Sequence, residues 1–380
     1  MDTAFPYHQY VTGKSFLGRR ADITLLGNLL TQGEHVAIYE PPRSGITSLV
    51  QQTLYSLRIQ GRSFTVGQLS ILNIRTAQDF LLRMGSTLIR MVASTPAEYK
   101  MLVQKYLADT HFVFDPLAFS ESDQVLSLSW ELDRADVLAM LRLPFRLAHD
   151  RGAHILLIVD NFHCITLLDN PDAILRPLSA VMKEETERLF SFVLCGSGVN
   201  AMKSVFEGSI LFHRLVERVR LSQVDEMEIT EHVLRGFRAG GKVVDQDLIV
   251  GACRLFHGNL WYINHFASIC DSLTRGYIME PVLVDALDCL LAIHAPYFMD
   301  TVNDLTTHQV NLLKATLEGV TRFSSSDTIR KYGLNSSANV KRVKDALMKK
   351  EVLVFDENDN PSLQDPLFEY WLRKYYFEQK

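Results

Sequence analysis

Three short apolar runs constrain the fold of this chain more than any other feature of its sequence. They are Glu34–Tyr39 (EHVAIY), His154–Asp160 (HILLIVD) and Phe190–Cys195 (FSFVLC). Apolar residues follow one another in these runs without polar alternation, which is typical of strands covered on both faces. Because helical periodicity separates the runs, the pattern predicts a parallel sheet with crossover helices.

Two further runs, Ser63–Leu69 and Val219–Leu221, complete a five-stranded, doubly wound sheet over residues 15–222. The 3.6-residue period predicts helices at residues 25–30, 46–58, 76–92, 134–151 and 172–187. Residues 96–133 break this rhythm with Pro96, Pro116 and a Ser-rich acidic stretch. We therefore expect an insertion there, with partial helix at its start.

The C-terminal part of the chain has a different pattern. Residues 225–294 are helical in period throughout, and the last 80 residues predict helices near 306–317, 325–332 and 336–350, then Val352–Phe355, a turn and a short return strand. Three helices followed by a hairpin are typical of a winged helix. For 380 residues we expect a domain at 1–222, a helical lid at 223–298 and a winged helix at 299–380.

Composition excludes several classes of protein. A net charge of -5 gives no general support for a nucleic-acid or membrane coat. The five cysteines are widely spaced without a metal-ligand rhythm, so we expect reduced core residues rather than disulfides or zinc. The start of the sequence has no signal-like pattern, and the run Ile155–Val159 is too short to span a membrane. We expect a soluble, cytoplasmic protein with no membrane partner.

The turn after the first strand has part of a phosphate-binding pattern. Such a loop needs glycine at a sharp turn, backbone N–H groups at a helix N-terminus, a lysine for the terminal phosphates and a Ser or Thr for Mg²⁺. Here it is Glu40-Pro41-Pro42-Arg43-Ser44-Gly45-Ile46-Thr47. Gly45 and Thr47 match G-x-x-x-x-G-K-[ST], whereas Glu40 replaces the first glycine and Ile46 replaces the lysine.

The surroundings of this loop resemble the STAND and archaeal-type ATPase branch of the AAA+ P-loop proteins. Phe16-Leu17-Gly18-Arg19-Arg20 is similar to the entry motif of that family, F-x-G-R-x-x-E, and the segment from Arg43 through Gly45, Thr47 and Ser48 to Leu49 is similar to GPRRxGKTSL. The resemblance implies an α/β P-loop NTPase (AAA+-like) fold, in which a parallel sheet flanked by helices is followed by a helical lid and a C-terminal winged helix. It also implies that ATP or ADP binds with Mg²⁺.

Later motifs extend the resemblance along nearly the whole chain. Asp160 stands in the magnesium position after the second apolar run, and Asn161 stands where the family has its catalytic glutamate. Gly196-Ser197 resembles the third signature, and His257 to Tyr262, with Trp261, resembles the lid motif. The tail Gln364 to Leu372 resembles the usual end of the family's winged helix.

The departures from the family pattern weigh against catalysis. Loss of the loop lysine removes a charge-assisted contact of roughly 1.5 to 3 kcal/mol. Glu40 adds a carboxylate near a polyanionic ligand, and Asn161 cannot accept a proton. We therefore expect weak or no ATP hydrolysis, with no residue assigned as catalytic.

Nucleotide binding stays open at the level of sequence. The resemblance and the anion-binding geometry assign it to Arg43, Ser44, Gly45, Ile46, Thr47 and Ser48, with Thr47 and Asp160 as magnesium ligands. The alternative is a strand, turn and helix that only connect core elements. Arg19, Ser197, Arg214 and Trp261 are further candidates. For Arg214, with Arg218 and Arg220, a solvated helix face is the simpler interpretation, and His163, His257 and His265 fit satisfied core or surface histidines.

The third helix of the predicted winged helix is locally basic. It has a single acid, Asp345, against five basic residues: Lys341, Arg342, Lys344, Lys349 and Lys350. DNA phosphates would suit such a helix, with Lys341, Arg342 and Lys344 as contacts, although lysines near a helix C-terminus also suit the helix dipole.

Three functions therefore compete. The first is a degenerate AAA+/STAND-type nucleotide-responsive switch or scaffold, a pseudo-ATPase that meets a protein partner of unknown identity. The second is an inert P-loop core that carries a winged-helix module for DNA or protein. The third is an active ATPase with a non-standard P-loop, in which Arg43 replaces the lysine. A monomer is our expectation in each case.

Overall fold

The computed structural model describes residues 4–356 and 358–377. Its contacts divide the chain into two units, and each is described by itself. The sheet unit comprises Ala21–Glu40 and Thr53–Leu221, and the lid unit comprises Met1–Arg20, Pro41–Gln52 and Ser222–Lys380. The turn predicted to bind phosphate therefore belongs to the lid unit, although the strand before it belongs to the sheet unit.

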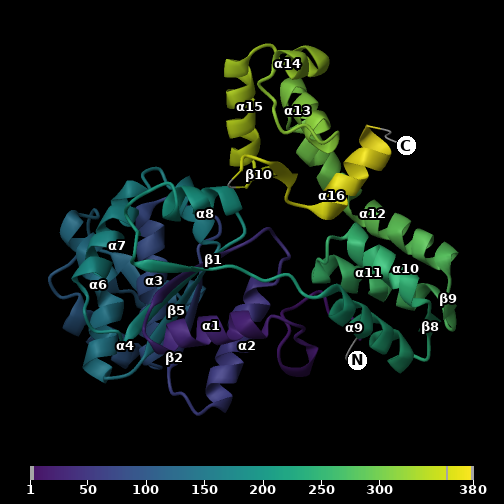
Figure 1. Ribbon diagram of the computed structural model, residues 1–380. Helices are drawn as coiled ribbons and strands as arrows, with labels where there is room; N and C mark the ends of the chain where they lie inside the picture. The colour runs from purple at the N-terminus through teal and green to yellow at the C-terminus, as the bar shows by residue number, and fades with distance from the viewer. Residues whose placement is uncertain (1–3, 357, 378–380) are drawn as a thin grey trace. The chain divides into compact units, whose positions relative to one another are not determined.

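A five-stranded sheet of order β2-β5-β6-β1-β7 forms the sheet unit (Figure 1). Every neighbouring pair is parallel. The strands are β1 (His35–Tyr39), β2 (Thr65–Ser70), β5 (Ile155–Asp160), β6 (Phe190–Gly196) and β7 (Val216–Val219). All residues of β6 and all but the last of β5 are buried, which explains their unbroken apolar runs. The predicted parallel sheet is confirmed.

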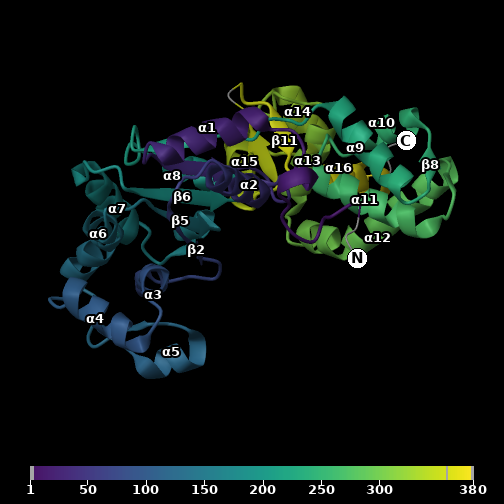
Figure 2. The ribbon, with the colours of Figure 1, turned by 90° about the horizontal axis from the view of Figure 1, so that it is seen from below.

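Helices cover both faces of this sheet. They are α1 (Arg20–Thr31), α2 (Ile46–Ile59), α3 (Ala77–Val92), α6 (Arg134–Arg151), α7 (Asp172–Glu184) and α8 (Val199–Phe206), with a short 3-10 turn η2 (Phe162–Leu167) after β5. In Figure 2, α1 lies on one face and α3, α6 and α7 lie on the other. A Cβ on Gly27 of α1 would stand 3.6 Å from Leu57 and 3.7 Å from Thr53, so α1 packs closely on the second half of α2.

Two details of the predicted α/β region are wrong. The last strand is Val216–Val219, a few residues before the predicted Val219–Leu221. The insertion is more ordered than expected, because it contains α4 (Pro96–Tyr106), β3 (Phe112–Phe114), α5 (Pro116–Ser122) and β4 (Leu126–Leu128). Thr95 and Asp115 cap its two helices, and β3 pairs with β4 in antiparallel register.

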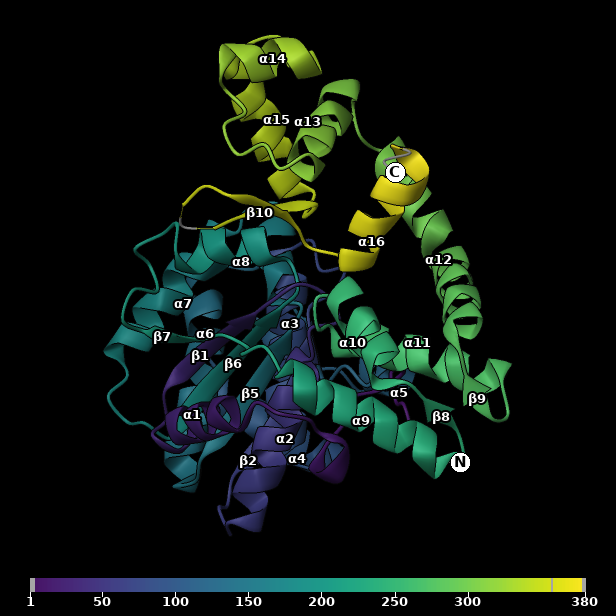
Figure 3. The same ribbon diagram turned by 45° about the vertical axis from the view of Figure 1, so that its right-hand side comes forward.

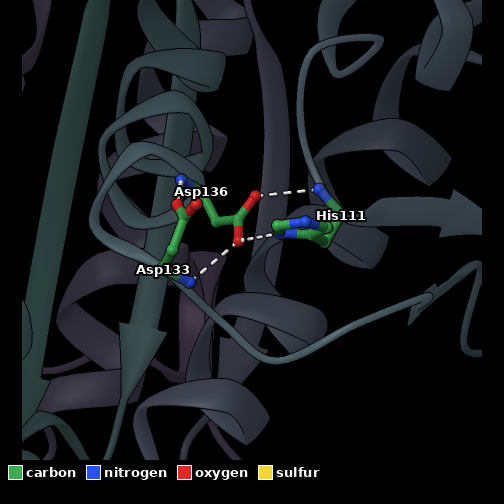
Figure 4. Close-up of side chains that lie close together, drawn as sticks. All are labelled: His111, Asp133 and Asp136. Carbon is green, nitrogen blue, oxygen red and sulfur yellow. Dashed lines mark hydrogen bonds and ion pairs between the residues drawn. The ribbon is translucent and has the colours of Figure 1, made fainter.

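Figure 4 shows how the insertion is tied to α6. The buried carboxylate of Asp136 accepts hydrogen bonds from the backbone N–H groups of His111 (2.8 Å) and Asp133 (2.9 Å), and it lies 2.9 Å from His111 Nδ1. Burial raises the pKa of Asp136, but these hydrogen bonds outweigh burial and lower it below its ordinary value. The three side chains meet closely enough for a metal ion, yet the capping box of α6 accounts for Asp133 and Asp136, and hydrogen bonds to Asp136 account for His111.

The lid unit begins with helices that follow the sheet. They are α9 (Glu226–Ala239), α10 (Gln246–Leu255), α11 (Leu260–Leu273) and α12 (Glu280–Asn303). The expectation of helix alone is wrong here, because β8 (Val243–Val244) and β9 (Tyr277–Ile278) form a small parallel pair. The predicted boundary between residues 298 and 299 falls inside α12, which leads toward the C-terminal module (Figure 3).

The C-terminal module is the predicted winged helix. It consists of α13 (Thr307–Leu317), α14 (Ser326–Tyr332), α15 (Ser337–Lys349), β10 (Leu353–Phe355), β11 (Pro361–Leu363), α16 (Pro366–Trp371) and a π-helical turn η3 (Leu372–Tyr376). The strands β10 and β11 pair antiparallel as the wing. One continuous hydrophobic core joins this module to the lid helices.

The N-terminal segment also packs into the lid unit. It contains a single 3-10 turn, η1 (Gly13–Ser15). Phe5 is buried in the lid core, where a Cβ on Gly236 of α9 would come within 2.6 Å of its ring. The N–H groups of Val11 and Gly13 donate to Ser48 Oγ (3.1 Å) and Gln52 Oε1 (2.6 Å) on α2. The segment thus fastens the first half of α2 to its own unit.

Two expectations from composition need correction. Cys164, Cys195, Cys253 and Cys270 are buried and free as expected, whereas Cys289 is exposed on α12. Ile155–Val159 is too short to span a membrane, but among the described residues α12 is long and apolar enough by length and composition, with a mean hydropathy of 1.5 over an 18-residue window. Only 28% of that window is buried, although α12 packs against α11 and α16.

Candidate functional site

The phosphate-like loop has an unusual backbone. Gly45, at the N-cap of α2, has φ +96°, and a Cβ there would lie 3.0 Å from Arg19 Nη1. Arg43 has φ +67°, a left-handed conformation that costs a residue with a Cβ roughly 1 kcal/mol or more. The loop therefore needs glycine at residue 45, and other contacts must hold residue 43.

Four consecutive backbone N–H groups of the loop are open. Those of Gly45, Ile46, Thr47 and Ser48 have no acceptor in the part of the chain that the structure describes, whereas Leu49 donates to Gly45 O (3.0 Å). Such groups at a helix N-terminus can hold an anion. The expectation that Ser44 joins them is wrong, because its N–H donates to Pro41 O (3.3 Å).

Two candidate residues support the loop from outside. The Arg19 guanidinium donates from Nη1 to Ser44 O (2.8 Å) and from Nε to Ser222 O (2.9 Å), so it braces the turn. The hydroxyl of Ser48 accepts from Val11 and is therefore already engaged. Thr47 is exposed, and its hydroxyl has no partner among the described residues.

Arg43 connects the loop to the lid and to the winged helix. Its guanidinium lies over the Trp261 ring, 4.2 Å from the centroid, and Nη1 donates to Tyr262 Oη (2.6 Å). The Tyr262 hydroxyl donates in turn to Asp365 Oδ2 (2.6 Å), which is 3.9 Å from Arg43 Nη1. We call these four residues, Arg43, Trp261, Tyr262 and Asp365, the arginine latch.

Each partner in the latch is itself fixed. Tyr262 is 1% exposed, and burial raises the pKa of its hydroxyl, so it stays a neutral donor. Asp365 is the N-cap of α16, because its Oδ1 accepts from the N–H groups of Leu367 (2.9 Å) and Phe368 (3.1 Å). One carboxylate therefore both begins the last α-helix of the winged helix and holds the loop arginine.

Aromatic and histidine side chains surround the lid side of the latch. Tyr7 stacks on His265 with ring centroids 4.1 Å apart, and Trp261 meets His265 edge-on at 5.2 Å. His265 and His294 are each 7% exposed. His265 Nδ1 and His294 Nε2 are buried without a hydrogen-bond partner among the described residues, so the expectation that His265 is a satisfied histidine is wrong.

Both of these histidines are held neutral. Burial lowers the pKa of His265 to about 4, with smaller effects from His294, His8 and Arg43. Burial, followed by the charge of Arg43, also lowers the pKa of His294. The cluster of Tyr7, Trp261, His265 and His294 therefore offers flat, uncharged rings and unused ring nitrogens.

The carboxylate expected to hold Mg²⁺ lies in the sheet unit. Asp160 ends β5 and accepts a hydrogen bond from the Gln68 amide, and burial raises its pKa while that bond opposes the shift. Asn161 is left-handed, with φ 58°, and its amide donates to Ser70 Oγ (3.2 Å). Asparagine tolerates a left-handed backbone better than glutamate does, so the backbone conformation explains why residue 161 is asparagine. Thr47 belongs to the other unit, so its pairing with Asp160 stays a prediction.

The other candidates of the sheet unit lie on separate segments of the chain. Ser197 follows β6, and Arg214 is an exposed left-handed residue in the turn before β7, without a partner among the described residues. The expected helix face is wrong, because Arg218 lies on β7 with its guanidinium 4.0 Å from the Tyr39 ring centroid. Glu40 Oε1 accepts from Leu221 N–H (3.3 Å), so this carboxylate anchors the chain after β7.

Only some of the basic side chains on α15 are available to a ligand. Lys341 and Arg342 are exposed, with no partner in the described ranges 4–356 and 358–377. Lys344 is instead held by Asp359 of the wing (2.8 Å) and lies 4.1 Å from the Phe355 ring centroid. Two of the three predicted contacts are therefore free to meet an anion.

The arginine latch predicts that substitutions of its residues have coupled effects on the free energy of unfolding. We expect Tyr262→Phe to lower the free energy of unfolding by about 1 to 2 kcal/mol, because it leaves Asp365 without its hydroxyl donor. Asp365→Asn should cost a similar amount, since asparagine still caps α16, and Asp365→Ala should cost about 1 kcal/mol more. Urea unfolding measures these values, and additive effects of Arg43→Ala and Tyr262→Phe would contradict a coupled latch.

The buried histidine predicts a pH dependence. The folded-state pKa of His265 is about 4, below the unfolded value near 6.5, so the unfolded state binds more protons between these pH values. Stability should therefore fall as pH decreases from about 6.5 to 4, and His265→Phe, which keeps a ring beside Tyr7, should flatten this slope. Urea unfolding at several pH values tests it, and equal slopes for both proteins would count against the prediction.

Comparison with known proteins agrees with this architecture. A protein-family model described as "Probable winged helix domain" matches residues 296–374. Among solved structures, the Walker-type ATPase PABY2304 of Pyrococcus abyssi is similar, with a TM-score of 0.67 and 14% identity over 98% of this chain and 100% of the other. The Aeropyrum pernix ORC2 protein, solved as ADPNP–ADP complexes, is similar with a TM-score of 0.56 and 14% identity over 96% of this chain and 93% of the other.

The sequence matches no curated protein. At 14% identity, likeness to the solved structures establishes the fold. The chain thus has an AAA+-like α/β fold with a parallel five-stranded sheet, followed by a helical region and a C-terminal winged helix.

Proposed function

We propose that the protein is a nucleotide-responsive switch or scaffold of the degenerate AAA+/STAND type, which binds ATP or ADP with Mg²⁺ and turns it over slowly or not at all. The AAA+-like fold supports the proposal. So does a structure of similar fold, the ORC2 protein, whose complexes hold ADPNP and ADP.

The phosphates would lie at the open N–H groups of Gly45 to Ser48. Their lack of partners among the described residues and their place at the start of α2 support this assignment. The exposed hydroxyl of Thr47 is free to ligate Mg²⁺. Ile46 offers no charge to the terminal phosphates, so we expect weaker binding than in a loop with lysine.

The arginine latch is the observation that carries the proposed switch. Arg43 belongs to the loop, yet Tyr262 of the lid and Asp365 of the winged helix hold its guanidinium. Phosphates at the loop would attract the same cation and compete with Asp365 for it. Lid and winged helix would then respond to whether the loop is occupied, with a coupling of about 1 to 3 kcal/mol.

Slow turnover is proposed because no proton acceptor stands after Asp160. Asn161 has an amide, and this amide donates to Ser70. A water molecule at this position would find no general base on that residue.

Thermal unfolding with nucleotide tests binding. We expect ADP or ATP with Mg²⁺ at millimolar concentration to raise the melting temperature, since a ligand at one hundred times its Kd stabilises by about 2.7 kcal/mol. Thr47→Lys, which places a long side chain at the exposed start of α2, should abolish the shift, and Thr47→Ser should retain it. A wild-type protein that melts at the same temperature with and without both nucleotides would refute nucleotide binding.

Phosphate release distinguishes the switch from an active ATPase. We expect a steady-state rate no greater than that of a Thr47→Ala control. Turnover well above this control, lost in Arg43→Ala, would instead favour the ATPase with a non-standard P-loop.

A second candidate function is DNA binding by the winged helix, favoured by the exposed, unpaired Lys341 and Arg342 on α15. In that case double-stranded DNA should bind with an affinity that falls steeply with salt, and Lys341→Glu with Arg342→Glu should abolish binding. Lys349→Glu is a matched control at the other end of the helix. Affinity unchanged by the double reversal would exclude α15 as the contact and favour a protein partner.

A further inference from the structure

A cavity of about 530 Å³ lies in the lid unit beside the arginine latch. Its walls come from the loop (Pro42 and Arg43), from the C-terminal half of α12, and from the turns of the winged helix before β10 and after β11. This volume is within the usual range for small-molecule sites. Because the loop, the lid helices and the winged helix all contribute to the lining, a ligand there would lie among all three parts of the lid unit.

The acidic side chains that line the cavity outnumber the basic ones. Four carboxylates line it, those of Asp300, Asp304, Glu351 and Asp365, against the two cations Arg43 and Lys350. Both cations are already matched, because Lys350 pairs with Asp304 and Arg43 contacts Asp365. Asp300 has no ion-pair partner among the described residues, and Glu351 accepts a hydrogen bond from the neutral amide of Gln364 (2.8 Å). Four acids against two bases leave the lining with a surplus of negative charge.

One buried acceptor in the cavity wall lacks a donor. The Gln364 side chain donates from Nε2 to Glu351, while its Oε1 is buried and has no hydrogen-bond partner in the part of the chain that the structure describes. A buried amide oxygen without a donor is unfavourable. Aromatic rings of Tyr297 and Phe368 stand in the same lining. A ligand that suits these groups brings N–H donors and positive charge, and it can place a cation against an aromatic face.

A single metal ion does not suit this cavity. Among the described residues, only His111, Asp133 and Asp136 bring three metal-ligating atoms within 4.8 Å of one another, and they lie in the sheet unit. The carboxylates of the cavity are more dispersed, so an extended cation matches them better than a point charge. We propose that the cavity binds a small organic cation with amine or guanidinium groups, held by Asp300, Gln364 and Asp365.

Binding there would reach the latch. A guanidinium or ammonium beside Asp365 competes with Arg43 for the same carboxylate. The cation would therefore loosen the hold of Asp365 on the loop. The site itself does not rest on the proposed nucleotide function, because the cavity and its charges exist without nucleotide.

Isothermal titration of the full chain without nucleotide tests the proposal. The probes are agmatine, which carries a guanidinium and an ammonium, and putrescine, a diamine. The control ligand is 1,4-butanediol, which has the carbon chain of putrescine without its charges. We expect saturable binding of at least one cation, weakened by added salt, and none of the diol.

Two variants on the same helix locate the site. Asp300→Asn, an exposed and nearly isosteric change, should weaken cation binding about tenfold, the loss of one charge-assisted hydrogen bond. Asp285→Asn removes an exposed carboxylate of α12 outside the cavity and should leave the affinity unchanged. A circular dichroism melt of each variant shows whether both fold like the wild type.

Three results would overturn the proposal. They are no saturable binding of either cation at millimolar concentration, equal binding of the diol, or equal weakening by Asp300→Asn and Asp285→Asn. Failure of nucleotide to bind leaves this titration unaffected, so the two proposals fail separately.

Discussion

The conformation of the loop depends on the charge of Arg43. A left-handed residue with a side chain is unfavourable, and this one is kept in place because its guanidinium meets an indole face, a hydroxyl and a carboxylate at once. The hydroxyl and carboxylate also define the start of α16 and the packing of the lid. Loop, lid and winged helix therefore share one electrostatic contact inside one unit.

Much of the fold could be predicted because its signals are local. Unbroken apolar runs mark strands buried on both faces, and the three helices of the winged helix have regular spacing and capping residues, such as Thr306 and Ser336. The strands of the insertion are harder to predict, because each is only three residues long and lacks the apolar continuity of the strands in the main sheet. Most of α12 lies in the region predicted as helical, but periodicity alone does not separate its exposed apolar side chains, such as Val284 and Ile293, from its buried ones.

The candidate site could be predicted only in part. Backbone N–H groups at the start of α2 follow from the position of Gly45, but the partners of a side chain do not follow from a motif. Arg43 and Tyr262 are 219 positions apart, and nothing local indicates that they meet. Lys344 and Glu40 have the charges that the sequence indicates, but both are engaged inside the fold. Lys344 pairs with Asp359 of the wing, and Glu40 accepts a hydrogen bond from Leu221 after β7. A motif gives the residue type, whereas packing decides whether that residue is available.

The distance of the latch residues along the chain has a consequence for synthesis. The loop leaves the ribosome long before Asp365 does. Until Asp365 is made, Arg43 lacks its carboxylate partner and α16 lacks its N-cap residue. Contacts between such distant segments form late, because they require closure of a long loop. A chain stalled before α16 would therefore hold a complete sheet and an unsupported loop, so synthesis of α16 sets the loop's conformation.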